Sequence, residues 1–160
     1  MEITAMPKQS AGLLLYRKRR GSLEVFLVHP GGPFWVNKDD GAWSIPKGEF
    51  GPDEDPLEAA KREFREETGL VSEGEHWPLK PIRQRGGKIV YAWAANSDLE
   101  SAAIKSNTFS MEWPSGSGKM QNFPEVDRAE WFTIDVARRK ILQGHLGLLE
   151  QLEQELAARA

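Results

Sequence analysis

The segment that most restricts the fold is the stretch from Asp55 to Thr68, which carries the marks of one amphipathic helix. A carboxylate at Asp53 or Asp55 ahead of Pro56 is a start signal, because it accepts hydrogen bonds from free N–H groups while proline suits the first turn. Gly69 is the stop signal, since glycine readily adopts the left-handed conformation that ends helices. The apolar positions share one face, namely Leu57, Ala60 and Phe64. We expect this face to pack against a β-sheet.

Apolar runs on both sides of this helix predict the strands of that sheet. The expected strands are 11–16, 25–29, 43–45, 81–85, 88–95, 109–113 and 129–133. Gly86 and Gly87 would turn one hairpin, and the basic residues from Arg17 to Arg20 another. Two helices, 135–142 and 146–158, are expected to close the chain. The predicted fold class is therefore α/β (α+β), with the sheet sandwiched between helices.

Two other segments have a distinct composition. The last helix carries an apolar stripe that indicates core or dimer packing, formed by Leu148, Leu149, Leu152 and Leu156. The stretch from Pro30 to Gly41 is rich in glycine and proline but also contains Phe34 and Trp35. It is too irregular for a strand and too aromatic for a plain linker, so we interpret it as a lid.

Size and charge limit the organisation of the chain and its partners. With 160 residues, it can bury one substantial core, so we expect a single domain over 1–160 with a loose segment at 1–9 and a C-terminal helix within 143–160. The net charge of −3 gives no general attraction to nucleic acid or anionic membranes. Any polyanion must therefore be bound locally, and an acidic protein that acts on phosphates usually recruits a cation.

Cysteine is absent, which excludes disulfides, thiolate metal sites and cysteine nucleophiles. The N-terminus lacks a basic region followed by an apolar one, and the apolar runs are much shorter than the roughly 20 residues of a membrane span. We expect a cytoplasmic protein without a membrane partner.

A cluster of carboxylates on the predicted helix suggests a metal site. Glu63, Glu66 and Glu67 stand at i, i+3 and i+4, so their side chains leave the helix on one side. Their mutual repulsion raises their pKa values, and a hard divalent ion with oxygen ligands would relieve it. On helix composition alone, a solvated charged face explains the same residues.

The longer pattern around these residues favours the metal site. From Gly48 to Leu70 the sequence is GEFGPDEDPLEAAKREFREETGL. It contains a glycine, five residues, Glu54, seven residues, and then Arg-Glu-apolar-x-Glu-Glu-x-Gly-apolar. This pattern resembles the Nudix box of the Nudix hydrolase family at every position. The resemblance implies an α/β/α sandwich with a mixed sheet, in which a loop-helix-loop binds Mg2+, with Mn2+ as a substitute, to cleave a pyrophosphate linkage.

The resemblance also implies roles for single residues. It makes Glu63 and Glu67 the principal metal ligands, Glu66 a further ligand, and the Gly48 carbonyl another. Arg62 would orient the glutamates, and Glu54 would fix the loop against the helix.

Outside the box, the family often uses a late loop carboxylate as general base or extra ligand. Glu125, six residues before Trp131, is the candidate for both roles. An exposed loop acid is the alternative reading, and Asp127 is a nearby competitor.

The substrate class rests on weaker resemblances. Trp43 to Gly48 is similar to the W-x-x-P-K-G entry of the dinucleoside polyphosphate and diphosphoinositol polyphosphate branches. This resemblance makes Trp43 and Lys47 substrate-binding candidates, with Lys47 holding a phosphate. Tyr91 resembles a strand tyrosine that stacks on a base, although a core tyrosine would have the same pattern. Further substrate candidates are Trp35, with packing under its loop as the alternative, and Lys119, with a solvated lysine as the alternative.

The function predicted is Mg2+-dependent hydrolysis of a nucleotide-like small molecule, specifically a dinucleoside polyphosphate, by a monomer or homodimer. Alternatives are a nucleoside triphosphate pyrophosphatase and a non-catalytic nucleotide-binding or regulatory module. RNA 5′-end processing has only the basic turn in its favour, because no basic, aromatic-interleaved stripe is present to bind the polymer.

Overall fold

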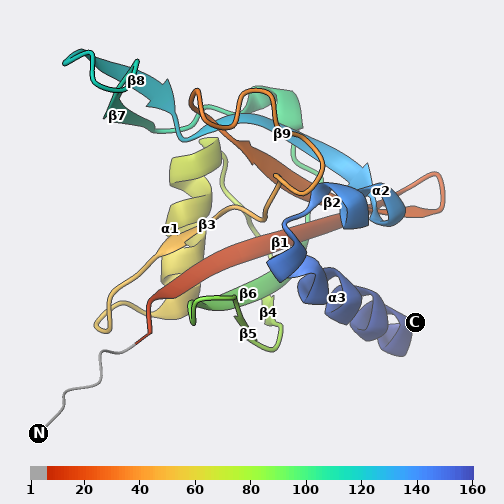
Figure 1. Cartoon of the computed structure of the whole chain (residues 1–160). Helices are drawn as coiled ribbons and strands as arrows, with labels where there is room; N and C mark the ends of the chain where they lie inside the picture. The colour runs from red at the N-terminus through yellow and green to blue at the C-terminus, as the bar shows by residue number, and fades with distance from the viewer. Residues whose placement is uncertain (1–6) are drawn as a thin grey trace, which may run out of the picture.

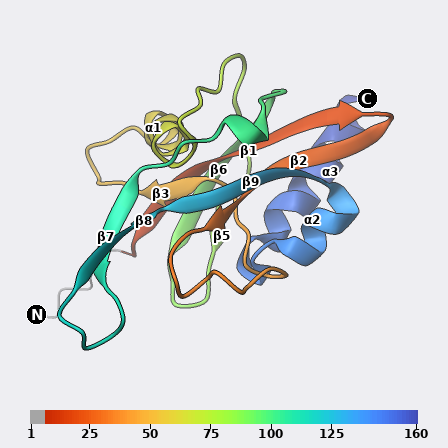
Figure 2. The same ribbon diagram turned by 90° about the horizontal axis from the view of Figure 1, so that it is seen from above.

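The computed structural model describes residues 7–160, in which a mixed sheet lies between helix α1 on one face and helices α2 and α3 on the other (Figures 1 and 2). The strands of this sheet are β1 (Gln9–Arg19), β2 (Ser22–Pro30), β3 (Lys47–Glu49), β4 (Trp77–Pro78), β5 (Ile82–Arg83), β6 (Ile89–Asn96) and β9 (Val126–Thr133). The helices are α1 (Pro56–Thr68), α2 (Ile134–Lys140) and α3 (Leu146–Arg159). The predicted fold class is confirmed.

The long strand β1 organises the sheet. It pairs in parallel with β6, while β2 and β3 run antiparallel to it along its other edge. The β1–β2 turn is tight, because Arg20 and Gly21 both adopt positive φ angles, 53° and 78°. Of the expected loose segment at 1–9, residues 1–6 lie outside the described residues, and Gln9 already belongs to β1.

Alternation along β1 divides the interior into two cores. Leu13 and Leu15 face α1 and pack with Phe64. Leu14 faces the other way and packs with the leucines of α3. Leu148, Leu149 and Leu152 are completely buried, and Leu156 packs on the same core. The apolar stripe of the last helix is therefore core packing, and each buried leucine contributes about 1.5–3 kcal/mol.

The expected strand at 43–45 is wrong in position. Trp43 and Ser44 form only isolated bridges, to Ile141 and Val28 respectively. The regular strand is β3, which begins two residues later at Lys47. Proline at position 46 has no N–H for a ladder, and its carbonyl instead accepts a hydrogen bond from Leu13 N at 3.1 Å.

The C-terminal helices also differ slightly from the prediction. Helix α2 ends at Lys140 rather than at 142, because Ile141 adopts an extended backbone with ψ of 147°. Its N–H still bonds to the Ala137 carbonyl at 2.9 Å. A short 3-10 turn, η2 (Gln143–His145), then leads into α3. No helix among residues 7–160 is long and apolar enough to cross a membrane.

A two-stranded hairpin, β7 (Thr108–Glu112) with β8 (Met120–Pro124), extends from the main sheet (Figure 2). The sequence predicts strand β7 but not β8, because the polar residues Gln121 and Asn122 interrupt the apolar alternation of β8. Phe109 and Phe123 pair across the hairpin with ring centroids 6.0 Å apart. The 3-10 turn η1 (Ser101–Ala103) lies between β6 and β7.

Candidate catalytic site

Helix α1 begins and ends where its capping residues predict. The Asp55 carboxylate accepts a hydrogen bond from Glu58 N at 3.0 Å. At the other end, Gly69 has a φ of 72°, and its N–H donates to the Arg65 carbonyl at 2.7 Å. These caps fix the helix ends, and Phe64 is buried in the core on the α1 side of the sheet. The neighbouring positions Glu63 and Glu67 are thereby held beside β3, Glu63 against Gly48 and Glu67 against the Lys47 N–H.

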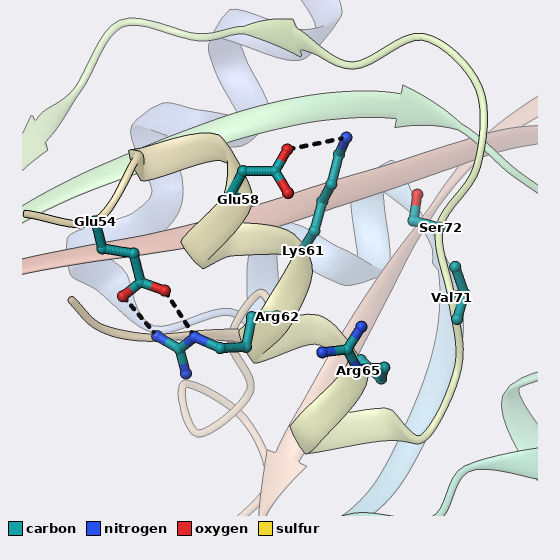
Figure 3. Close-up of a pocket in the computed structure, with 7 residues that line it drawn as sticks. All are labelled: Glu54, Glu58, Lys61, Arg62, Arg65, Val71 and Ser72. Carbon is teal, nitrogen blue, oxygen red and sulfur yellow. Dashed lines mark hydrogen bonds and ion pairs between the residues drawn. The ribbon is translucent and has the colours of Figure 1, made fainter.

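Arg62 ties the carboxylates of the predicted box together. Its Nε and Nη2 donate to the two Glu54 oxygens at 2.8 and 3.0 Å, a bidentate pair visible in Figure 3. Its Nη1 donates to Glu63 at 2.9 Å and to both Glu66 oxygens at 3.2 Å. The hydrogen bond with Glu54 is the main reason that the Arg62 pKa is raised above its usual value. Arg62 is therefore placed to orient three carboxylates.

Strand β3 sits directly against two of the glutamates. A Cβ atom at Gly48 would collide with the Glu63 carboxylate, so only glycine fits there without displacing it. The neighbouring Lys47 N–H donates to Glu67 Oε1 at 3.2 Å. The β3 backbone thus presents its own polar groups to the same carboxylates that the box predicts as metal ligands.

Glu125, outside the box, is electrostatically coupled to these glutamates. It lies between β8 and β9, held by bonds from Glu125 N to the Asn107 carbonyl at 2.8 Å and from Gly31 N to the Glu125 carbonyl at 2.9 Å. Its charge acts on Glu63 and Glu67, and the Glu66 charge acts on it. Asp127, the competing acid, instead contacts the buried His29 at 2.8 Å.

Desolvation and mutual repulsion make the cluster electrostatically unfavourable. Burial is the main cause that raises the pKa of Glu67, to about 8, and the charges of Glu63 and Glu125 add to it. Burial likewise raises the pKa of Glu63, despite its bond to Arg62. Desolvation and the nearby Glu66 raise the pKa of Glu125. These carboxylates have more negative charge than the surrounding protein neutralises.

The carboxylate oxygens of Glu63, Glu66 and Glu67 are donors of the kind that a hard divalent cation prefers. Within the described part of the chain, no three carboxylate or imidazole groups already stand together as a preformed cage. In the present arrangement Arg62 binds Glu63 and Glu66, while Glu67 accepts the Lys47 N–H. A cation would compete with Arg62 for the same oxygens.

The opposite face of β3 carries basic and imidazole groups. Lys47 pairs with Gly12, where a Cβ would stand 2.7 Å from Lys47 Cβ, so this side chain lies on the face away from α1. Burial, followed by the charge of Lys88, lowers the Lys47 pKa. His145 is completely buried nearby, with Nε2 2.8 Å from Gln84 Nε2 and no partner for Nδ1 among the described residues. No sequence motif identified His145.

Trp43 is a correction to the predicted substrate contacts. Its side chain is 1% exposed, with ring centroids 4.9 Å from Phe132 and 5.1 Å from His29. Its Nε1 donates to Asp39 at 2.8 Å. A side chain enclosed in this way has no surface left for a substrate, so Trp43 is a core residue.

The other predicted substrate residues occupy different positions. Tyr91 is half-buried on β6, with its hydroxyl 3.3 Å from Gln9 Nε2 and its ring 6.0 Å from Phe50. Trp35 is half-buried and packs against the core on the α2–α3 side. Lys119 is exposed in the β7–β8 loop, which points away from α1 and the main sheet in both views (Figures 1 and 2). The structure does not bring Lys119 to the carboxylates.

Comparisons with known proteins agree with this geometry. The model of the NUDIX domain matches residues 6–152. A bis(5′-nucleosyl)-tetraphosphatase [asymmetrical] from Caenorhabditis elegans is 37% identical over 68 residues, which cover 42% of this chain and 45% of that protein. The chain thus aligns with less than half of this curated relative.

Among solved structures, a C. elegans Ap4A hydrolase binary complex superposes with a TM-score of 0.61 at 26% identity, covering 94% of this chain and 98% of that one. The NUDIX domain of Shewanella oneidensis NrtR, crystallised with ADP ribose, gives a TM-score of 0.68 at 20% identity and covers 96% and 90%. The match over residues 6–152, together with the box residues at the carboxylate cluster, shows that this chain belongs to the Nudix family.

Proposed function

We propose that this protein is a magnesium-dependent hydrolase that cleaves a pyrophosphate linkage in a dinucleoside polyphosphate. The observation that carries the proposal is that Glu63 lies against Gly48, shares Arg62 with Glu66 and is followed by Glu67 at the Lys47 N–H, while burial and neighbouring carboxylates, Glu125 included, raise the pKa values of Glu63 and Glu67. A polyphosphate brings still more negative charge, so productive binding requires divalent cations at this cluster.

In this proposal Glu63, Glu66, Glu67, Glu125 and the Gly48 carbonyl hold Mg2+, or Mn2+ in its place. Such ions neutralise the phosphates and lower the pKa of a bound water, which turns it into a nucleophile near neutral pH. Arg62 keeps the carboxylates oriented through its bonds to Glu54, Glu63 and Glu66.

The alternative role for Glu125 is general base instead of ligand, because without a bound cation its raised pKa lets it accept a proton closer to neutral pH than an ordinary glutamate.

Two lines of support favour a dinucleoside polyphosphate as substrate. The C. elegans relative is a bis(5′-nucleosyl)-tetraphosphatase, and the superposed structure is an Ap4A hydrolase. In addition, Lys47 next to Gly48 in β3 is the residue proposed to hold a phosphate, and the half-buried Tyr91 ring is proposed to stack on a base.

A non-catalytic nucleotide-binding module is the alternative from another class. NrtR, whose NUDIX domain was crystallised with ADP ribose and which was also crystallised with DNA, has this fold. Retention of every box glutamate favours catalysis, because a binding module has no need for four crowded carboxylates. A nucleoside triphosphate pyrophosphatase would use the same cluster on a shorter substrate.

Product analysis with purified protein tests the proposal. Diadenosine polyphosphates, nucleoside triphosphates, ADP-ribose and inositol pyrophosphates would each be incubated with and without Mg2+. We expect magnesium-dependent cleavage of the diadenosine polyphosphates to be fastest. Preference for a triphosphate would support the pyrophosphatase instead, and binding of nucleotides without cleavage would support the module.

A further inference from the structure

The loop between β2 and β3, residues 31–46, exposes one aromatic ring and hides the next. Phe34 is 64% exposed, and Val36 beside it is 62% exposed. Trp35 packs inward against the core instead. The Phe34 and Trp35 rings meet edge-on with centroids 5.3 Å apart, so the buried ring supports the exposed one. An exposed aromatic on a supported loop is available to a ligand.

The loop is anchored on both sides of Phe34. Gly31 N donates to the Glu125 carbonyl at 2.9 Å, before the ring. After it, His29 Nε2 lies 2.6 Å from the Lys38 carbonyl, and Asp39 accepts from Trp43 Nε1 at 2.8 Å and from Lys140 Nζ at 2.6 Å. A segment held at both ends loses little conformational freedom when it binds a ligand.

These anchors also place Phe34 near the catalytic cluster. Gly31 bonds directly to Glu125, and three residues of extended chain span at most about 10 Å. The Phe34 backbone is therefore within about 10 Å of Gly31, whose N–H binds Glu125. A nucleotide with a phosphate at the carboxylates can extend over that distance to the ring.

A cation stands over the same ring. Lys38 Nζ lies 3.9 Å from the Phe34 ring centroid and 5.0 Å from that of Trp35. Among the described residues, Lys38 forms no ion pair within 4.0 Å. The loop thus offers an exposed aromatic ring together with a positive charge that no described carboxylate pairs with. A base attached to a phosphate has the complementary pair of features.

We infer that Phe34 and Lys38 form a nucleotide-binding platform, in which the Phe34 ring stacks on a base and Lys38 binds the attached phosphate. The platform would hold the nucleoside end of the substrate that lies farther from the metal cluster. This inference rests on the proposed function for its substrate, but nucleotide binding at the loop can be measured separately. It replaces Trp35, which faces the core, with its neighbour as the stacking residue.

Binding of ADP in the presence of EDTA, measured by calorimetry, tests the platform without catalysis. Phe34→Ala should weaken ADP binding ~10-fold, the usual loss for one base–aromatic stack. Phe34→Trp should retain it, and Lys38→Met should weaken it by ~10-fold or more. Val36→Ala is the matched control, because it removes an equally exposed apolar side chain from the same loop. That control should stay within ~2-fold of the wild type.

Hydrolysis of a diadenosine polyphosphate by the same variants separates the two claims. We expect Phe34→Ala to raise KM with little change in kcat, because the ring contacts substrate away from the reacting phosphorus. No ADP binding by the wild type, or equal affinity in Phe34→Ala, Lys38→Met and the wild type, would overturn the platform. Loss of ADP affinity in Phe34→Ala but not Val36→Ala, in a protein that cleaves no dinucleotide, would support the platform and refute the proposed substrate.

Discussion

Glu67 and His145 lie on opposite faces of the main sheet, and desolvation drives both toward their neutral forms. It raises the pKa of Glu67 to about 8 and lowers the pKa of His145 to about 3. Their surroundings differ, however. Glu67 has further carboxylates around it, whereas His145 has the Gln84 amide and the positive charges of Lys47 and Lys88. The comparison shows that burial alone does not mark a metal site; the site is marked by burial combined with unneutralised like charge.

The largest expected effect is on the carboxylate face. Glu67→Gln should lower kcat by about two orders of magnitude or more, since it removes a ligand charge but almost no volume. Glu58→Gln, on the exposed side of the same helix, should leave kcat within ~2-fold. Steady-state kinetics with circular dichroism would check both variants. Full activity in folded Glu67→Gln would refute the ligand assignment.

A substitution at Gly48 should show how much activity depends on the position of the Glu63 carboxylate, because it leaves the charges of the site unchanged. Gly48→Ala puts a Cβ into the Glu63 carboxylate, so we expect kcat to fall by about 10- to 100-fold and Mg2+ affinity to weaken. Gly51→Ala, which has no neighbour within 4 Å at its Cβ, is the control. Equal activities of the two variants would mean that β3 does not position Glu63.

The pH dependence of stability should differ between the two faces of the main sheet, with Glu67 on one and His145 on the other. The folded-state pKa of Glu67, about 8, is above its unfolded value of 4.5, so the folded state binds more protons between these values. Without metal, stability is therefore lost as pH rises from about 4.5 to 8, by at most about 1.4 kcal/mol per pH unit. Urea unfolding with EDTA should show this slope in the wild type and a smaller one in Glu67→Gln. Added Mg2+ should stabilise the wild type more at pH 8 than at pH 5.

His145 should affect the stability of the protein at acidic pH. Its folded-state pKa of about 3 is below the unfolded value of 6.5, so the unfolded state binds the extra proton between them. Its contribution to stability is present above about pH 6.5 and is lost as the pH falls toward 3. His145→Asn should flatten the acid side of the urea-unfolding profile without changing its response to Mg2+. An altered Mg2+ response would link the two faces.

The smallest effect should come from Lys119. Because its loop points away from the main sheet, Lys119→Met should change kcat/KM by less than ~2-fold (Figure 1). Lys47→Met, which removes the proposed phosphate ligand next to Gly48 in β3, should raise KM by about 10-fold. A larger effect at Lys119 than at Lys47 would show that the hairpin folds over the substrate.

The parts of the fold that local chemistry determines were predictable from sequence. Asp55 and Gly69 end α1 through their own capping bonds, and Gly48 to Leu70 carries the box in one continuous stretch. The role of Trp43 could not be predicted in this way, because the local sequence around a tryptophan does not show whether its side chain faces a ligand or the core. Its burial depends on Phe132 and His29, which are distant in sequence.

The orientation of the residues in the β2–β3 loop and the contact of His145 also depend on residues that are distant in sequence. Phe34 and Trp35 are adjacent aromatic residues, and only the packed core shows which of them faces inward. His145 contacts Gln84, which is 61 residues away in sequence, so no local sequence pattern predicts their contact. Contacts that only the tertiary structure creates are therefore not predictable from local sequence patterns.

Binding of Mn2+ to the wild-type protein and to Glu67→Gln, followed by electron paramagnetic resonance, would show whether these carboxylates hold a metal. We expect saturable binding by the wild type that Mg2+ displaces and that weakens ~10-fold or more in Glu67→Gln. Equal Mn2+ affinity in both proteins, with both folded, would contradict a metal site at these carboxylates.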